Sequence, residues 1–272
     1  MITKFIKDTY LWFEKKLKND HLDSYAAQSA FFLIISILPF SVFFLSILNL
    51  ININGETVIS YALNLFPNEI GDFLKTFILV EYQPITILSV SGFAVLWSAS
   101  KAAYAIVKGL NSVYAIDETR NYLHVRFLAI FYTIAFAIIL VATIVILLFG
   151  NSLYTFIINR IAPDFTSVVF DDKYLWAFII LTIFFCASYN LVPRKVNIKF
   201  KYSAISALIA SSSWMLFSFG FSFFIENFAN YSNMYGGLAT VVIFMLWLYF
   251  CMYIMLFSAE ISVWLQEKFE TK

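Results

Sequence analysis

The spacing of charged residues constrains the fold of this chain more than any other feature. Only 13% of its 272 residues are charged, and six intervals between consecutive charges are long and apolar. A charged side chain is costly in hydrocarbon, and a helix needs about 20 apolar residues to cross roughly 30 Å of it. We therefore predict an all-α membrane protein with six transmembrane helices. The predicted spans are 29–49, 83–103, 127–149, 174–192, 203–225 and 238–259.

The distribution of basic residues predicts the orientation of these spans. Of the 18 Lys and Arg residues, all but Lys75, Arg160 and Lys173 lie before the first span, in the second and fourth connections, or after the last span. Basic residues accumulate on the cytoplasmic side of membrane proteins. We therefore expect both termini in the cytoplasm, with a cytoplasmic helix over 1–22, a transmembrane domain over 23–265 and a short tail over 266–272.

Two segments outside the spans have helical patterns of their own. Residues 3–18 place aromatic and aliphatic side chains mainly on one side and lysines on the other, which predicts an amphipathic helix on the inner membrane surface. This helix would set the depth of the first span or bind a partner. The first outside connection, about 51–83, is interrupted by Pro67 and predicts two short helices at the outer interface or over the bundle.

Polar and small residues within or beside the spans are the candidate functional features. Lys101 and Glu260 lie near the predicted inner boundary, where they would form a buried pair or reach separately for water. Pro39 predicts a kink in the first span, which either flanks a cavity or is simply packed. The fifth span carries a stripe of small residues that predicts a packing seam or a polar pathway. Its members are Ala204, Ala207, Ser211, Ser218 and Ser222.

Catalytic and nucleotide-binding patterns are missing from the sequence. Its two histidines, His21 and His124, are far apart, and Cys186 and Cys251 both fall inside predicted spans. No zinc-protease, glycine-rich phosphate-binding or serine-hydrolase motif occurs, so we expect no enzymatic activity, no metal site and no cofactor. The net charge of +1 argues against a nucleic-acid-binding surface.

Three ordered stretches resemble a known family. They are SASKAAYAIVKGLNSVY from Ser98, LVPRKVNIKFKYSAISALIASSSW from Leu191 and NFANYSNMYGGLATVVIFMLWLYFCMYIMLFSAEI from Asn227. With the preceding DSYAAQSAFFLIISILPF, they resemble the YihY/BrkB family of integral membrane proteins, formerly named ribonuclease BN. Two motifs depart from the family pattern, because Ser258 stands where the family has glycine and Gly237 where it commonly has serine. The resemblance implies a multi-pass protein of the bacterial cytoplasmic (inner) membrane without an agreed biochemical activity.

These features together lead to a functional hypothesis. We expect transport or flipping of an amphiphilic envelope component, with membrane lipids as partners and a lipid-like or small molecule as substrate. The hypothetical inner gate consists of Lys101, Arg126 and Glu260. The hypothetical outer mouth consists of Asn230, Tyr231, Tyr235, Gly236 and Gly237. Interfacial anchoring and a tight turn also account for the second group. The alternative function is a scaffold whose N-terminal helix recruits a protein partner, and a ribonuclease is disfavoured.

Overall fold

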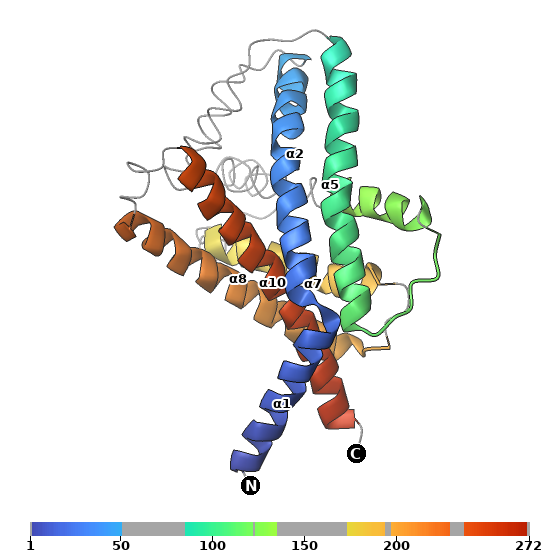
Figure 1. Cartoon of the computed structure of the whole chain (residues 1–272), viewed down its shortest axis with the longest axis vertical. Helices are drawn as coiled ribbons and strands as arrows, with labels where there is room; N and C mark the ends of the chain where they lie inside the picture. Colours follow the sequence, from blue (N-terminus) through green and yellow to red (C-terminus); the bar gives the residue numbers. More distant parts are fainter. Residues whose placement is uncertain are drawn as a thin grey trace, which may run out of the picture.

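The structure, a computed structural model, describes residues 2–50, 85–121, 123–134, 173–193, 197–228 and 237–270. These residues form helices connected by short irregular segments, with no strand in the described ranges (Figure 1). The labelled helices are α1 (Ile2–Asp20), α2 (Leu22–Leu50), α5 (Ile85–Val113), α7 (Lys173–Leu191), α8 (Phe200–Phe228) and α10 (Gly237–Glu270). A further helix covers Leu123–Ile134. The predicted all-α class is confirmed.

The helices coincide with the predicted spans but extend beyond several of them. Within the described residues, three helices are long and apolar enough to cross a membrane. They cover Ser89–Val113, Phe200–Ile225 and Val241–Glu270. α2 contains the whole first predicted span and continues through Pro39. α7 covers nearly all of the fourth, and the six-span topology as a whole stays a prediction. The short helices expected over 51–83 and the outer end of the third span lie outside the described residues.

Small buried residues bring α2 and α5 together along most of their lengths. These two helices form the most extensive helix pair in the structure and run side by side in Figure 1. Ala26 and Ala30 of α2, like Ala102 and Ala105 of α5, are buried. The Ser29 hydroxyl, also buried, bonds to the Tyr25 carbonyl at 2.8 Å and approaches the Ala102 carbonyl at 3.4 Å. Small side chains allow such close backbone approach, which favours association of helices in lipid.

The small-residue stripe predicted on the fifth span serves packing at several of its positions. Ala207 and Ser211 of α8 are fully buried, and Thr182 of α7 donates a 2.8 Å hydrogen bond to the Ser211 hydroxyl. Two turns further along α8, Trp247 of α10 donates to the Ser218 hydroxyl at 3.3 Å. These hydroxyls therefore join α8 to both neighbouring helices, as expected for a packing seam.

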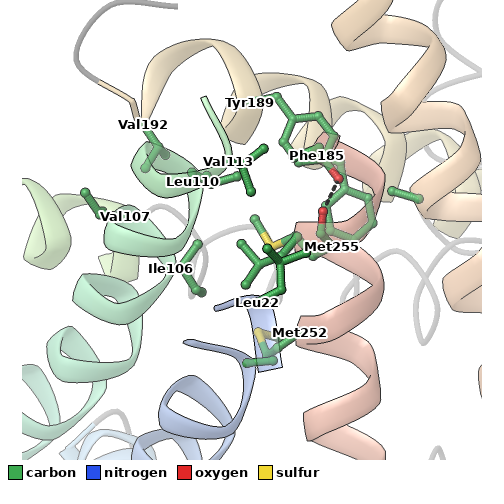
Figure 2. Packing of buried hydrophobic residues seen from close by; sticks show 14 of the residues in the cluster. Leu22, Ile106, Val107, Leu110, Val113, Phe185, Tyr189, Val192, Met252 and Met255 are labelled. Carbon is green, nitrogen blue, oxygen red and sulfur yellow. Dashed lines mark hydrogen bonds between the residues drawn. The ribbon is translucent and has the colours of Figure 1, made fainter. Parts of the chain in front are cut away.

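The main hydrophobic core lies where α2, α5, α7 and α10 meet. Leu22, Leu110, Phe185 and Met255 are almost completely buried there, and Figure 2 shows them converging from the four helices. The Tyr189 hydroxyl of α7 enters this apolar cluster and donates a 2.8 Å hydrogen bond to the Met255 carbonyl. A buried hydroxyl needs such a partner, because burying an unpaired polar group is costly.

α1 packs against the end of α10 through its aromatic residues. The Phe13 ring lies 5.5 Å from the Phe257 ring and 6.0 Å from the Trp264 ring, measured between centroids. The Trp12 indole donates a 2.8 Å hydrogen bond to Glu267. These two aromatic side chains, predicted to face lipid, thus contact α10, whereas Tyr10 is exposed. The segment is helical, and its amphipathic role on a membrane surface stays a prediction.

Candidate functional site

A sharp junction between α1 and α2 places an acidic residue inside the protein. His21 separates the two helices and has a φ of 52°, in the left-handed region. Its carbonyl accepts hydrogen bonds from the backbone N–H groups of Ser24 and Tyr25 at 3.1 and 3.2 Å. Histidine tolerates this conformation better than most residues do. At this bend, Asp20, the last residue of α1, and Leu22, the first of α2, are both buried.

Lys16 connects this junction to the end of α5. Its Nζ lies 2.7 Å from Oδ2 of Asp20, one helical turn away, and donates a 3.1 Å hydrogen bond to the Val113 carbonyl. Val113 is the last residue of α5. Terminal carbonyls of a helix lack partners within the helix and carry partial negative charge, so a lysine there is stabilising. One ammonium group therefore serves both a carboxylate and a helix end.

Glu260 of α10 is the most deeply buried charged residue of this region. It is 0% exposed, and neither of its carboxyl oxygens has a hydrogen-bond partner among the described residues. Asp20, Lys16 and Glu267 are the charged residues close enough to influence its carboxyl group electrostatically. The buried Tyr114 hydroxyl lies beside Ser262, two positions along α10. We call Lys16, Asp20, Tyr114 and Glu260 the acid cluster.

Arg126 forms a second buried polar site, beside Trp97 of α5. It is 6% exposed, and its Nη2 donates a 2.8 Å hydrogen bond to the Trp97 carbonyl. The guanidinium carbon also lies 4.8 Å from the centroid of the Trp97 ring, a favourable cation–π distance. Its Nε is buried without an acceptor in the described part of the chain. One turn further along α5, the Lys101 ammonium lies 5.1 Å from the Phe32 ring centroid.

The structure therefore places the three predicted inner-gate residues in two locations. Arg126 and Lys101 both lie beside the 97–101 turn of α5, whereas Glu260 lies near Tyr114, just past the end of that helix. At 1.5 Å per residue, Lys101 and Tyr114 are roughly 20 Å apart along α5. The charged neighbours of Glu260 are Lys16, Asp20 and Glu267. Of the predicted outer mouth, Gly237 begins α10, and Asn230, Tyr231, Tyr235 and Gly236 lie outside the described residues.

The Glu118 carboxylate stabilises the connection that follows α5. Glu118 accepts hydrogen bonds from Arg120 Nε at 2.8 Å and Nη2 at 2.6 Å, and from the Asn111 amide at 2.7 Å. The Arg120 guanidinium holds the pKa of the Glu118 carboxyl below its usual value, because these hydrogen bonds favour the charged form. This arrangement ties the connection back to the last turns of α5, close to the acid cluster.

The match to a family model decides which family this architecture represents. Residues 13–272 match the model described as virulence factor BrkB. The chain belongs to the BrkB family. The resemblance seen in the sequence motifs is thereby confirmed, and the match covers every helix from the middle of α1 onward. No solved structure matches the chain.

Several relatives are similar to this chain over more than half of their length. A ribonuclease-like protein YfkH of Bacillus subtilis is 29% identical over 259 residues, covering 90% of each chain. A UPF0761 membrane protein of Vibrio campbellii is 27% identical over 277 residues, covering 98% of this chain and 86% of the relative. A UPF0761 membrane protein of Idiomarina loihiensis is 32% identical over 170 residues, covering 60% and 56%. Two of these names describe membrane proteins and the third a ribonuclease-like protein, so they agree on no biochemical activity.

Sequence reasoning singled out Glu260 but not the residues that surround it. Lys16 and Asp20 form a helical i, i+4 ion pair, and this spacing could have predicted their contact from the sequence. Their position near α10 follows from the fold, including the bend at His21, which no motif announces. Among the described residues, no group of three or more His, Cys, Asp and Glu is arranged to hold a metal ion.

Proposed function

We propose that this membrane protein moves an amphiphilic component of the bacterial envelope across the cytoplasmic membrane. The observation that carries the proposal is the burial of ionisable side chains within an apolar helical bundle. Glu260 is fully buried without a donor in the described residues, and Arg126 is buried with a free Nε. Such residues are expensive in membrane proteins, and they commonly mark pathways for ions or substrates.

The two buried sites lie at different heights of the bundle, which suits a pathway with more than one polar station. The acid cluster lies at the end of α5, and Arg126 with Lys101 lies roughly 20 Å along the same helix. An amphiphile with a charged headgroup would need polar contacts at successive depths while its apolar part stays in lipid. We place its outer entrance at Asn230, Tyr231, Tyr235, Gly236 and Gly237.

Reconstitution tests the proposal directly. Purified protein is placed in liposomes with labelled anionic and zwitterionic lipids, and exchange between leaflets is followed with and without a pH gradient. We expect protein-dependent exchange that falls at least tenfold in Glu260→Gln and in Lys101→Ala. Lys108→Ala is the matched control, because Lys108 is an exposed lysine of α5 whose ammonium also lies over an aromatic ring, 4.8 Å from the centroid of Tyr104.

Two results would count against transport. One is the absence of exchange across the lipid panel by protein shown to be folded, and the other is equal exchange in all three variants. A nuclease assay on the same preparation tests the activity that the name of YfkH suggests for that relative.

A scaffolding function is the alternative, favoured by the outer face of α1. Tyr10 and Leu11 are 65% and 50% exposed, although Phe13 of the same helix is docked on α10. The double variant Tyr10→Ser/Leu11→Ser leaves that docking intact. A scaffold should lose its protein partner in this variant, whereas a transporter should keep its lipid exchange.

A further inference from the structure

We propose that one exposed face of α5 binds a single phospholipid of the inner leaflet, whose anionic headgroup contacts Lys101 and Arg126. The inference deepens the proposed function and rests on it, because it names the class of headgroup that one of the two polar sites recognises. The binding step can be measured without any movement of lipid across the membrane.

The apolar part of this face consists of large side chains that recur at helical spacing and are exposed. Val90, Phe93 and Trp97 are 71%, 68% and 52% exposed. Residues three or four positions apart lie on the same side of a helix. The Phe93 and Trp97 rings stack, with their centroids 6.0 Å apart. On a membrane helix such a stripe faces acyl chains, which are as apolar as these side chains.

Two cations lie at one end of the apolar stripe. Lys101 follows Trp97 by one helical turn, and its ammonium lies 5.1 Å from the Phe32 ring centroid of α2. Arg126, from helix 123–134, has its guanidinium carbon 4.8 Å from the Trp97 ring centroid, and its Nη2 donates a 2.8 Å hydrogen bond to the Trp97 carbonyl. Figure 1 shows α2 and helix 123–134 beside α5. Three helices therefore contribute to this end of the stripe, and two of them supply a positive charge.

The surrounding helices carry almost no acidic residues to neutralise these cations. α5 and helix 123–134 contain no Asp or Glu, and α2 contains only Asp23, in its first turn. Glu118, which precedes helix 123–134, is paired with Arg120 at 2.6 Å. Among the described residues, only Nη2 of Arg126 has a hydrogen-bond partner, and its buried Nε has none. A buried cation without a counter-charge is costly, so this site favours an anion.

The length of the stripe matches one leaflet of a bilayer. From Val90 to Lys101, α5 rises roughly 16 Å, and half of the hydrocarbon core is about 15 Å thick. Lys101 also lies near the predicted inner boundary. A lipid of the inner leaflet therefore has its acyl chains along Phe93 and Trp97 and its phosphate at the two cations. A guanidinium group suits phosphate oxygens through paired N–H donors, and a lysine ammonium adds a point charge.

A lipid fits this site better than a soluble anion does, because exposed apolar rings surround the cations. Phe127, adjacent to Arg126, is 62% exposed, and Phe31, adjacent to Phe32, is 48% exposed. A soluble phosphate would lose its hydration among these rings, at a large cost in free energy. The phosphate of a lipid already lies at the boundary of the hydrocarbon, and its acyl chains cover the rings.

Native mass spectrometry of the full chain in detergent tests the inference. Phosphatidylglycerol is the anionic probe, and phosphatidylcholine is the zwitterionic one. We expect one phosphatidylglycerol molecule per chain, bound about 25-fold more tightly than phosphatidylcholine. Lys101→Gln and Arg126→Gln should each weaken its binding about fivefold, and the double variant should lose the preference. Lys108→Gln is the matched control, because this exposed lysine lies about 10 Å further along α5 and should not affect binding.

Three results would overturn the inference. They are equal affinity for the two lipids, unchanged phosphatidylglycerol binding in both single variants, and complete displacement of the lipid by glycerol 3-phosphate, which would indicate a site for a soluble anion. Circular dichroism melting verifies that the variants are folded. Lys101 is only partly buried, so Lys101→Gln provides the test even if Arg126→Gln does not fold.

The same measurements distinguish failure of this inference from failure of the proposed transport. Selective binding of phosphatidylglycerol without exchange between leaflets would overturn transport and support the lipid site. Exchange by a protein that binds both lipids equally would overturn the lipid site and leave transport standing.

Discussion

At the scale of single residues, the end of α5 carries a backbone strain that one substitution should relieve. Ala115 has a φ of 51°, its N–H donates to the Ser112 carbonyl at 2.9 Å, and the N–H of Ile116 donates to the Asn111 carbonyl at 2.8 Å. This is the Schellman arrangement, in which glycine normally occupies the left-handed position. We expect Ala115→Gly to stabilise the protein by about 1 kcal/mol. Thermal unfolding in detergent measures this, with Ala115→Val as the control that should destabilise.

Glu118 makes a pH-dependent contribution to stability at the same connection. Its pKa is lowered in the folded protein from an ordinary value of 4.5, chiefly by hydrogen bonds from Arg120. A lowered pKa stabilises the fold above the unfolded-state value, and this contribution is lost as the pH falls through the lower folded-state value. Melting curves should show Glu118→Gln less stable than wild type at pH 7 by about 1 kcal/mol. The difference should begin to shrink as the pH falls below about 4.5 and disappear below the lower folded-state pKa, and a constant difference would contradict the assignment.

The acid cluster shows how far residue identity alone can predict a site. Glu260 stood out because it is the first charge after a long apolar run, and the cost of burying a charge makes such a position informative. Asp20 and Lys16 resembled ordinary members of a solvated, lysine-rich helix. Asp20 is buried and Lys16 half-buried in a helix that packs on α10 through Phe13, and tertiary packing of this kind leaves no periodic signal in the chain.

At the scale of elements, substitution of alanine for glycine should have opposite effects on stability at Gly109 and at Gly220. A Cβ at Gly109 of α5 would lie 3.0 Å from Cδ2 of Leu256 and 3.2 Å from Cβ of Tyr25, so the Leu256 side chain of α10 and the Tyr25 position of α2 would have to give slightly. At Gly220 of α8 a Cβ would meet nothing within 4 Å. In Gly109→Ala, we expect overpacking to lower the stability by about 1–3 kcal/mol. The better helix propensity of alanine offsets roughly 1 kcal/mol of that loss.

Gly220→Ala provides the matched control for that experiment. It gains the same propensity without a clash, so it should stabilise by up to about 1 kcal/mol. Thermal unfolding of the two variants in one detergent provides the comparison. Equal stability of the pair would show that the approach of α5 to α2 and α10 is looser than described.

Charge spacing predicted the elements well and their ends poorly. The cost of charge in hydrocarbon located the apolar interiors of α5, α8 and α10, because few other folds tolerate such long intervals. It could not show that α5 continues ten residues beyond the predicted span or that α10 continues to Glu270. Those turns contain Lys108 and Glu267, which a helix accommodates readily outside the hydrocarbon or against another helix. The ends of the predicted spans therefore mark the ends of the apolar intervals, and the helices continue beyond them.

At the scale of the whole molecule, the length of α10 and the docking of α1 determine which parts share a side of the membrane. The 34 residues of α10 extend about 50 Å, whereas the hydrocarbon core is about 30 Å thick. One end of α10 therefore projects well beyond the core. The contacts of Trp12 and Phe13 with Glu267 and Trp264 bring α1 to that projecting end, and Figure 1 shows the two together at the base of the molecule.

This arrangement predicts that residues near both chain ends are accessible from the cytoplasm alone. Single cysteines replace Lys7 or Lys268 in a chain carrying Cys186→Ser and Cys251→Ser. A membrane-impermeant maleimide should label both in inverted vesicles and neither in intact spheroplasts, whereas Asn54→Cys, in the predicted outside connection, should show the reverse. Labelling of Lys7→Cys and Lys268→Cys from opposite sides would require an odd number of spans, and it would be incompatible with α1 packed on the end of α10. Labelling of both from outside would invert the orientation predicted from the basic residues while leaving that packing intact.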